Sequence, residues 1–135
     1  MTRFDTSLSQ LLDREREVYV RVTRRDGKIG ELPIWIVTVD GEAYVRSYLA
    51  DRGAWYRRAL ANGRMTLVVR STAHPVVVEP TRDEALNRRI SEAFVAKYGS
   101  RGPARTMVSE PVTATTLRVS PAESAAGAKR GRPEA

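Results

Sequence analysis

The residues of this chain with the greatest potential for chemistry lie in one short basic stretch. That stretch, Ala43 to Leu60, reads AYVRSYLADRGAWYRRAL, and it passes from a strand-like pattern through a glycine into a helix-like one. Guanidinium groups bind phosphate oxygens in pairs of hydrogen bonds, and the first N–H groups of a helix also bind anions. A glycine before the helix lets a ligand approach the backbone closely. We therefore predict a phosphate or anion site built from Arg46, Ser47, Arg52, Arg57 and Arg58.

Two other interpretations of the same stretch are open. In the first, Trp55 and Ala59 face the core and the arginines are a solvated surface. In the second, the arginines and the tail sequence KRGRP (129–133), which is similar to an AT-hook core, bind nucleic acid. The second is disfavoured because the aromatic residues lie on a predicted helix beside an apolar strand, and not on an open sheet face. Charge favours an anionic partner, since residues 44–70 contain six arginines against one aspartate.

The remaining polar residues provide only weak candidates for catalysis. His74 is the single histidine, and Tyr48 and Tyr56 are considered as proton donors because of their location alone. The chain has no cysteine, which excludes disulfides, thiol nucleophiles and thiolate metal sites. One histidine without neighbouring carboxylates predicts no metal site.

Size and composition indicate a single domain followed by a tail. The chain has 135 residues, 41% of them apolar, and a net charge of +7. We predict one domain over residues 1–119 and a disordered basic tail over 120–135, where no apolar residue could anchor a core. Neither a signal-peptide run nor an apolar run of membrane-spanning length is found, so we expect a cytoplasmic protein without a membrane partner.

The hydrophobic pattern predicts a mainly β (α+β) fold, a small six-stranded antiparallel barrel with short flanking helices. Short strands separated by hairpin signals favour such a barrel over a parallel sheet. Helices are predicted after capping boxes at residues 7–10 and 81–84, and from about 51 to 61. The six strands are predicted at 17–24, 32–39, 43–47, 65–70, 75–79 and 114–119.

The order of these motifs resembles the flavin- and deazaflavin-binding split β-barrels, which include the pyridoxamine-phosphate oxidases and the deazaflavin-dependent nitroreductases. The matching pieces are LPIWIVTVDGEAYVRS, GAWYRRAL, LNRRISEAFVAKYG and MVSEPVTATTLRV. Within that superfamily the chain is most similar to a family of small uncharacterised bacterial proteins, and the resemblance covers about Phe4 to Val119. It implies a homodimer with the cofactor, FMN or a deazaflavin coenzyme, in a groove between subunits.

The resemblance also implies roles for particular residues. Pro33, Ile34 and Trp35 would run under the flavin ring, and Arg46 and Ser47 would contact the phosphate. The corresponding positions of the following loop and helix hold Arg52, Trp55, Arg57 and Arg58. The chain departs from the pattern at Leu32, where nitroreductase-like relatives have threonine, and in the loop 48–51, which lacks their Gly-Ser-Gly-Lys type.

Two functions of different class follow. The first is a flavin- or deazaflavin-dependent oxidoreductase that acts on a small organic molecule. The alternative is a split barrel without a redox cofactor, which binds or transforms another anionic small molecule in a biosynthetic pathway. Both use the same basic, aromatic-walled groove, and nucleic-acid binding through the arginines and the tail ranks below them.

Overall fold

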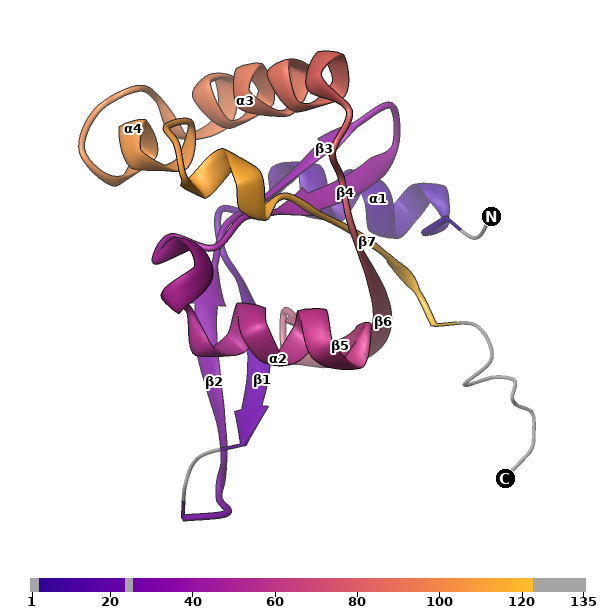
Figure 1. The fold of residues 1–135 in the computed structure, drawn as a ribbon. Coiled ribbons are helices and arrows are strands. Elements are labelled where there is room, and N and C mark those ends of the chain that lie inside the picture. Colours follow the sequence, from indigo (N-terminus) through magenta and orange to yellow (C-terminus); the bar gives the residue numbers. More distant parts are fainter. Residues whose placement is uncertain (1–2, 24–25, 123–135) are drawn as a thin grey trace.

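The computed structural model describes residues 3–23 and 26–122, and these form one curled antiparallel sheet with helices around it (Figure 1). The strands run in the order β2-β1-β5-β6-β7-β4-β3. Their bounds are β1 Val18–Thr23, β2 Ile29–Ile34, β3 Ile36–Val39, β4 Glu42–Val45, β5 Arg64–Val69, β6 Thr72–Pro80 and β7 Leu117–Pro121. The helices are α1 Thr6–Arg14, α2 Ala54–Asn62, α3 Glu84–Tyr98 and α4 Pro103–Met107, with short 3-10 turns η1 Ala50–Arg52 and η2 Val112–Thr115.

The predicted single strand 32–39 is two strands, which is why the sheet has seven strands and not six. β2 and β3 are separated along the chain only by Trp35, yet they lie at the two opposite ends of the sheet. Ile34 pairs with Val18 of β1, whereas Ile36 pairs with Val45 of β4. The sheet therefore curls until its two edges meet at Trp35, which is the split-barrel architecture expected from the sequence.

Two tight hairpins set the strand register. The Asp40-Gly41 hairpin is confirmed, with φ of 53° and 79° at the two turn residues and Val39 paired with Glu42. Positive φ at both positions is typical of the two-residue hairpin turn that matches strand twist. A second turn of this kind, which the sequence analysis missed, is formed by Arg70 and Ser71 with φ of 48° and 71°. Neither residue is the asparagine or glycine usual there.

The helix starts differ from the predicted capping boxes. Asp5, and not Ser7, caps α1 by accepting a hydrogen bond from the Leu8 N–H at 2.8 Å. Asp83, and not Thr81, caps α3. Aspartate caps a helix as well as serine or threonine does, and in both cases an aspartate two residues from the predicted cap is the N-cap.

The helix predicted from about 51 to 61 begins later than expected. Residues 50–52 form η1, Gly53 is the N-cap of α2, and Gly63 ends α2 in the left-handed conformation at φ 69°. The end at Gly63 is as predicted.

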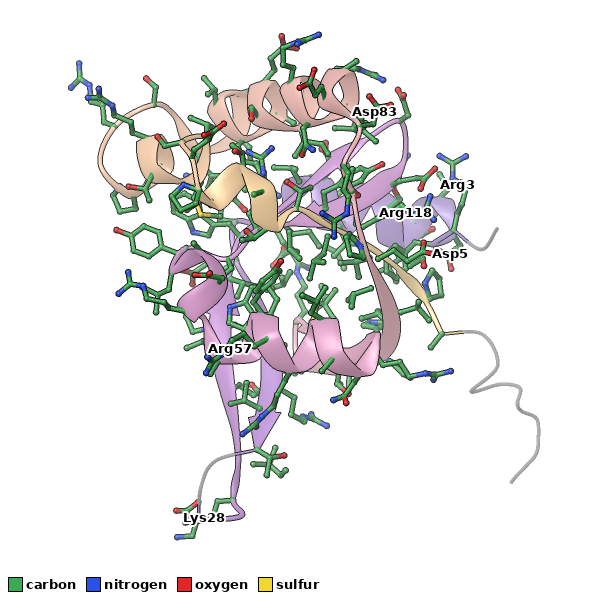
Figure 2. The ribbon with its side chains drawn as sticks, in the orientation of Figure 1. Arg3, Asp5, Lys28, Arg57, Asp83 and Arg118 are labelled. Atoms are coloured by element: carbon green, nitrogen blue, oxygen red, sulfur yellow. The ribbon has the colours of Figure 1, made fainter. Side chains whose placement is uncertain are left out.

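Side chains fill the space between the curled sheet and α2, as Figure 2 shows. This barrel core contains buried residues of most strands together with Trp55, Tyr56 and Ala59 of α2. A second cluster packs β3 and β4 against α3, α4 and η2, and it includes Ile90 and Phe94 at the predicted spacing of four. α3 therefore covers the outer side of β3 and β4, opposite α2 (Figure 1).

The end of the chain also differs from the prediction. Residues 112–115 form η2, and β7 begins only at Leu117. The strand continues past the predicted domain boundary at 119, because Ser120 pairs with Val77 and Pro121 with Val76. The rest of the predicted tail, residues 123–135, lies outside the described residues.

Candidate functional site

A pocket of about 810 Å³ opens where the ends of several elements meet. Its wall is contributed by β1 and β2, the break at Trp35, the segment from Arg46 to the start of α2, and α4. The lining is mainly apolar, and it includes both tryptophans of the chain. A largely apolar cavity with a few polar groups is the usual form of a small-molecule site.

Most of the residues predicted to bind a cofactor line this pocket. The structure brings together residues that are up to 25 positions apart along the chain, on β2, after β4 and on α2. Seven of the nine predicted positions contribute to the wall: Pro33, Ile34, Trp35, Arg46, Ser47, Trp55 and Arg58.

Arg52 and Arg57 are not part of the pocket wall. Both side chains are exposed. Successive residues of an α-helix are rotated by about 100°, so Arg57 projects about 200° away from the inward-facing Trp55. Arg58, about 60° from Trp55 on the other side, lies on the pocket side of α2. Arg52 ends η1 before the helix begins and shares none of this geometry.

Arg46 lines the pocket, but its donors are already used within the protein. The guanidinium group is buried, with 1% of the residue exposed. Nε donates to Thr116 Oγ1 at 2.9 Å, and Nη1 donates to Ser91 Oγ and to the Met107 carbonyl, both at 2.9 Å. Nη2 donates to the carbonyl and the side-chain oxygen of Asn87 at 3.1 and 3.3 Å. These five acceptors match the five N–H groups of an arginine.

The charge of Arg46 has no carboxylate partner within the described residues. None of the ion pairs that residues 3–23 and 26–122 form includes it. Burial lowers the pKa of Arg46 to about 10, so the group is still cationic near neutral pH. Its guanidinium carbon lies 5.2 Å from the centre of the Phe94 ring, which gives a partial compensation. Arg46 therefore gives the pocket wall a positive charge while it ties β4 to α3, α4 and η2.

Ser47 is also committed to local structure. Its hydroxyl donates to the Ala50 carbonyl at 2.8 Å, and its N–H donates to Thr115 Oγ1 at 2.9 Å. A Cβ atom on Gly53 would lie only 2.4 Å from Ser47 Oγ. The glycine is thus required by the serine beside it, and the pair fixes the turn that leads into α2.

Unused donors lie at the start of α2. Gly53 has no side chain to cap the helix, and no side-chain capping hydrogen bond is formed there. Gly53 and Ala54 both line the pocket, so the positive end of the helix dipole lies at its wall. Arg58 is exposed beside them, and its Nη1 donates to the Thr23 carbonyl. This corner is the part of the wall best suited to an anion.

The three candidate catalytic residues are not brought together. Tyr48 lines the pocket and is 51% exposed. Tyr56 is buried in the barrel core, where its ring packs edge-on against Trp55 with ring centres 6.2 Å apart. His74 lies in β6 opposite Leu67 and does not contribute to the pocket. Only Tyr48 is placed where it could contact a ligand.

The residues that hold Arg46 in place were not predicted from the sequence. Asn87 and Ser91 are one helical turn apart on α3, directly beside the predicted apolar row of Leu86 and Ile90. Two polar residues at this spacing next to a buried row are a usable signal for a buried polar partner. Of the other two anchors, Met107 lies in α4, which the hydrophobic pattern does not predict, and Thr116 directly follows η2 within the predicted strand 114–119.

Within the described part of the chain, no three histidine, aspartate or glutamate side chains are grouped so that they could hold a metal ion. None of the described helices has the length and apolar character needed to cross a bilayer.

Solved structures with this fold belong to the split β-barrels. HutZ, the heme storage protein from Vibrio cholerae, is 10% identical, with a TM-score of 0.60 over 88% of this chain and 90% of that one. ChuZ from Campylobacter jejuni is 10% identical with a TM-score of 0.60, and this chain covers 86% of its own length but only 51% of ChuZ. An F420-H2 dependent reductase (FDR-A) is 16% identical, with a TM-score of 0.54 and coverage of 78% and 94%. The fold is therefore the split β-barrel expected from the sequence.

Residues 8–119 match the family described as "Uncharacterized protein conserved in bacteria (DUF2255)", and the chain belongs to this family. No curated protein matches the chain. The family assignment agrees with the resemblance found in the sequence, and it spans all the elements that line the pocket.

Proposed function

We propose that this protein is a homodimeric split barrel that binds a flavin or deazaflavin coenzyme in the 810 Å³ pocket and acts on a small organic molecule as an oxidoreductase. The observation that supports this most is the pocket wall, in which an apolar, tryptophan-containing surface adjoins an uncapped helix start and an arginine. The solved F420-H2 dependent reductase of the same fold is consistent with it.

The residues of the pocket suit a flavin-type coenzyme. The volume lies within the range of about 300–1,000 Å³ that is usual for such sites. Pro33, Ile34 and Trp35 form an apolar wall for the ring system, and Trp55 contributes a second aromatic surface. When bound, the coenzyme supplies hydride transfer, while the protein orients it and excludes water.

The anionic end of the coenzyme is assigned to the start of α2. There the N–H groups after Gly53 and the guanidinium group of Arg58 provide donors. Arg46 has no free N–H group, and it acts at this site through its uncompensated charge. Buried charges act at longer range than exposed ones because water screens them less. The Ser47 hydroxyl already donates to Ala50, so it is left out of the set of donors.

Tyr48 is the candidate residue for donating a proton to the substrate. Its side chain is exposed at the pocket, whose wall also includes the start of α2 and Arg58. A phenol is able to donate a proton or a hydrogen bond to a reduced or reacting oxygen. Tyr56 and His74 are not proposed for this role because neither contributes to the wall.

A second copy of the chain is proposed to complete the pocket. Leu32, Tyr48 and Leu49 line the pocket and are 43%, 51% and 50% exposed, so apolar surface continues from its interior to its rim. Among the strands of residues 3–23 and 26–122, β2 lies at one end of the sheet and has one backbone edge without a strand partner. A partner that covers these three side chains would enclose the ligand between subunits.

One observation favours the second candidate, a split barrel without a redox cofactor that binds another anionic small molecule. The residues expected to contact the ribityl phosphate, Arg46 and Ser47, have their donors engaged within the protein. An anion smaller than a flavin phosphate ester would need only the corner formed by Arg58 and the start of α2. The two candidates differ in whether the aromatic wall is occupied by a ring.

The test is a visible absorption spectrum of the purified protein, followed by titration with FMN and with the deazaflavin coenzyme F420. The proposal predicts flavin or deazaflavin absorbance on purification, or binding with a dissociation constant on the order of 1 µM, equivalent to about −8 kcal/mol. Light scattering should give the mass of a dimer. If neither coenzyme binds at saturating concentration, the redox proposal fails and the alternative is retained; a monomer with or without coenzyme overturns the dimer.

A further inference from the structure

The break at Trp35 is held from outside the barrel by the last turn of α3. Ile36, the first residue of β3, donates its N–H to Tyr98 Oη at 3.2 Å. Its carbonyl oxygen accepts a hydrogen bond from Lys97 Nζ at 2.7 Å. β3 is an end strand of the sheet, so these groups take the place of a neighbouring strand. The residue next to Trp35 is thereby fixed by two side chains that lie more than sixty positions away.

The same two side chains bind the start of the barrel. Tyr98 Oη donates to the Arg16 carbonyl at 2.7 Å, and Lys97 Nζ donates to the Leu12 carbonyl at 2.8 Å. Arg16 in turn donates from Nη1 to the Lys97 carbonyl at 2.9 Å. Four parts of the chain therefore meet at one point: α1, α3, β3 and the short segment that precedes β1.

The ring of Tyr98 covers one face of Trp35. The two rings are stacked, with centres 4.1 Å apart and an angle of 2° between their planes. The Arg16 guanidinium carbon and Lys97 Nζ lie 5.2 and 5.3 Å from the centre of the Tyr98 ring. Burial raises the pKa of the Tyr98 hydroxyl to about 12, so it stays protonated and keeps its hydrogen bond to Arg16. Because one indole face is covered, the surface that Trp35 presents to the pocket is its other face or its edge.

We infer that Tyr98 is the positioning residue of the pocket: it holds Trp35 as a preformed aromatic platform against which a planar ring of the ligand stacks. This inference rests on the proposed function for the identity of the ring, and on the geometry above for the role of Tyr98. Tyr98 does not line the pocket, so it acts only through Trp35. An indole held in one orientation loses less conformational freedom when a ring binds to it.

The test uses Trp55→Phe as the background, because Trp35 is then the only tryptophan. In this background we compare Tyr98→Phe, which keeps the ring and loses the hydroxyl, with Tyr98→Leu, which removes the ring. Val95→Ala, at an exposed position of the same helix, is the matched control. For each folded variant, acrylamide quenching of Trp35 and the dissociation constant for FMN are measured.

The inference predicts that Tyr98→Leu increases acrylamide quenching of Trp35 and weakens FMN binding by about three- to tenfold, the range of one aromatic pair. Tyr98→Phe should stay within about twofold of the background in both measurements, because the stack is retained. Unchanged quenching and affinity in Tyr98→Leu overturns the inference. If the leucine variant does not fold, Tyr98→Met fills the same space without a ring and is judged by the same outcomes.

The two proposals fail in different ways. If the Trp55→Phe background and the unmodified protein both fail to bind FMN and F420, the proposed function is wrong. The quenching measurement needs no ligand, and in that case it alone decides whether Tyr98 positions Trp35.

Discussion

Replacement of Arg46 by methionine gives the sharpest separation between a structural and a ligand-binding role for this residue. Methionine is flexible, unbranched and uncharged, so the substitution removes all five hydrogen bonds and keeps an apolar side chain in the space of the arginine stem. The acceptors left behind are the hydroxyls of Thr116 and Ser91, the carbonyl of Met107 and two oxygens of Asn87.

The magnitude follows from these acceptors. A buried acceptor that loses its partner costs about 1–3 kcal/mol. Thr116 Oγ1 also donates to the Thr113 carbonyl, so it keeps one bond, and the part of Asn87 near the surface has access to water. Loss of the desolvated charge, which is disfavoured by burial, offsets a further part. We therefore expect a net loss of about 3–5 kcal/mol of unfolding free energy, because the Ser91 hydroxyl, the Met107 carbonyl and one Asn87 oxygen lose their donors at about 1–3 kcal/mol each, less this offset.

The assay is urea denaturation followed by far-ultraviolet circular dichroism, with linear extrapolation to water. Arg57→Met is the control, because this arginine is exposed and outside the pocket, and its effect should stay within about 0.5 kcal/mol. Arg46→Lys should fall between the two, since a lysine has three donors where the arginine has five. If Arg46→Met is as stable as the wild type but loses affinity for FMN, the guanidinium group contacts the ligand and the reasoning is refuted.

Three further predictions concern the pocket corner and α3. Arg58→Ala should weaken FMN binding by about 1.5–3 kcal/mol, the worth of a charged hydrogen bond, while Arg57→Ala should leave the dissociation constant unchanged; equal losses in both would contradict the assignment. Gly53→Ala should destabilise the fold by about 1–3 kcal/mol through its contact with Ser47 Oγ, and Ser47→Ala in the same chain should recover part of this loss in urea titrations. Unfolding free energy should rise between about pH 8 and 10.5 in the wild type, and rise less in Lys97→Met.

The pH effect has a defined sign. Burial lowers the pKa of Lys97 from 10.5 to about 8, with Asp13 and Glu15 opposing and Arg16 assisting the shift. Between these two values the unfolded chain binds more protons than the folded one, so stability increases with pH. Lys28→Met is the control, at the tip of the β1–β2 hairpin far from the rest of the molecule (Figure 2). A pH slope identical in wild type and Lys97→Met would contradict the prediction.

The sequence was a good guide where a local pattern has a single physical solution. Asp40-Gly41 is a residue pair that tolerates the positive φ of a two-residue hairpin turn, so it predicted the β3–β4 hairpin and its register. The row of Ile90 and Phe94 gave the buried face of α3, and Gly63 gave the end of α2. The order of these motifs was enough for the split-barrel fold.

The break at Trp35 could not be predicted, because it is a consequence of the closed sheet. Residues 32–39 read as one continuous strand, and only tertiary pairing assigns Ile34 to β1 and Ile36 to β4. η2 and α4 were not predicted for a different reason: each is too short to show the periodic spacing of apolar residues that indicates a helix.

For the candidate site, the sequence identified the residues of the wall better than their roles. Arg46 was predicted to bind a ligand phosphate, but its five hydrogen bonds go to four residues on α3, on α4 and directly after η2, which the segment around Arg46 does not reveal. Arg57 and Arg58 are adjacent in sequence, but the rotation of the helix places one in solvent and the other at the pocket.

The most direct test of the proposed function compares FMN with riboflavin, which has the same ring system and no phosphate, by the quenching of tryptophan emission. Both tryptophans line the pocket, so binding of either FMN or riboflavin should quench their emission. We expect both to bind, and FMN to bind about tenfold or more tightly, because only FMN engages the positive corner formed by the start of α2 and Arg58. Equal affinity for FMN and riboflavin would contradict the assignment of the phosphate to the start of α2 and Arg58. Absence of quenching by FMN, riboflavin and F420 alike would contradict the proposal that the pocket binds a flavin-type coenzyme.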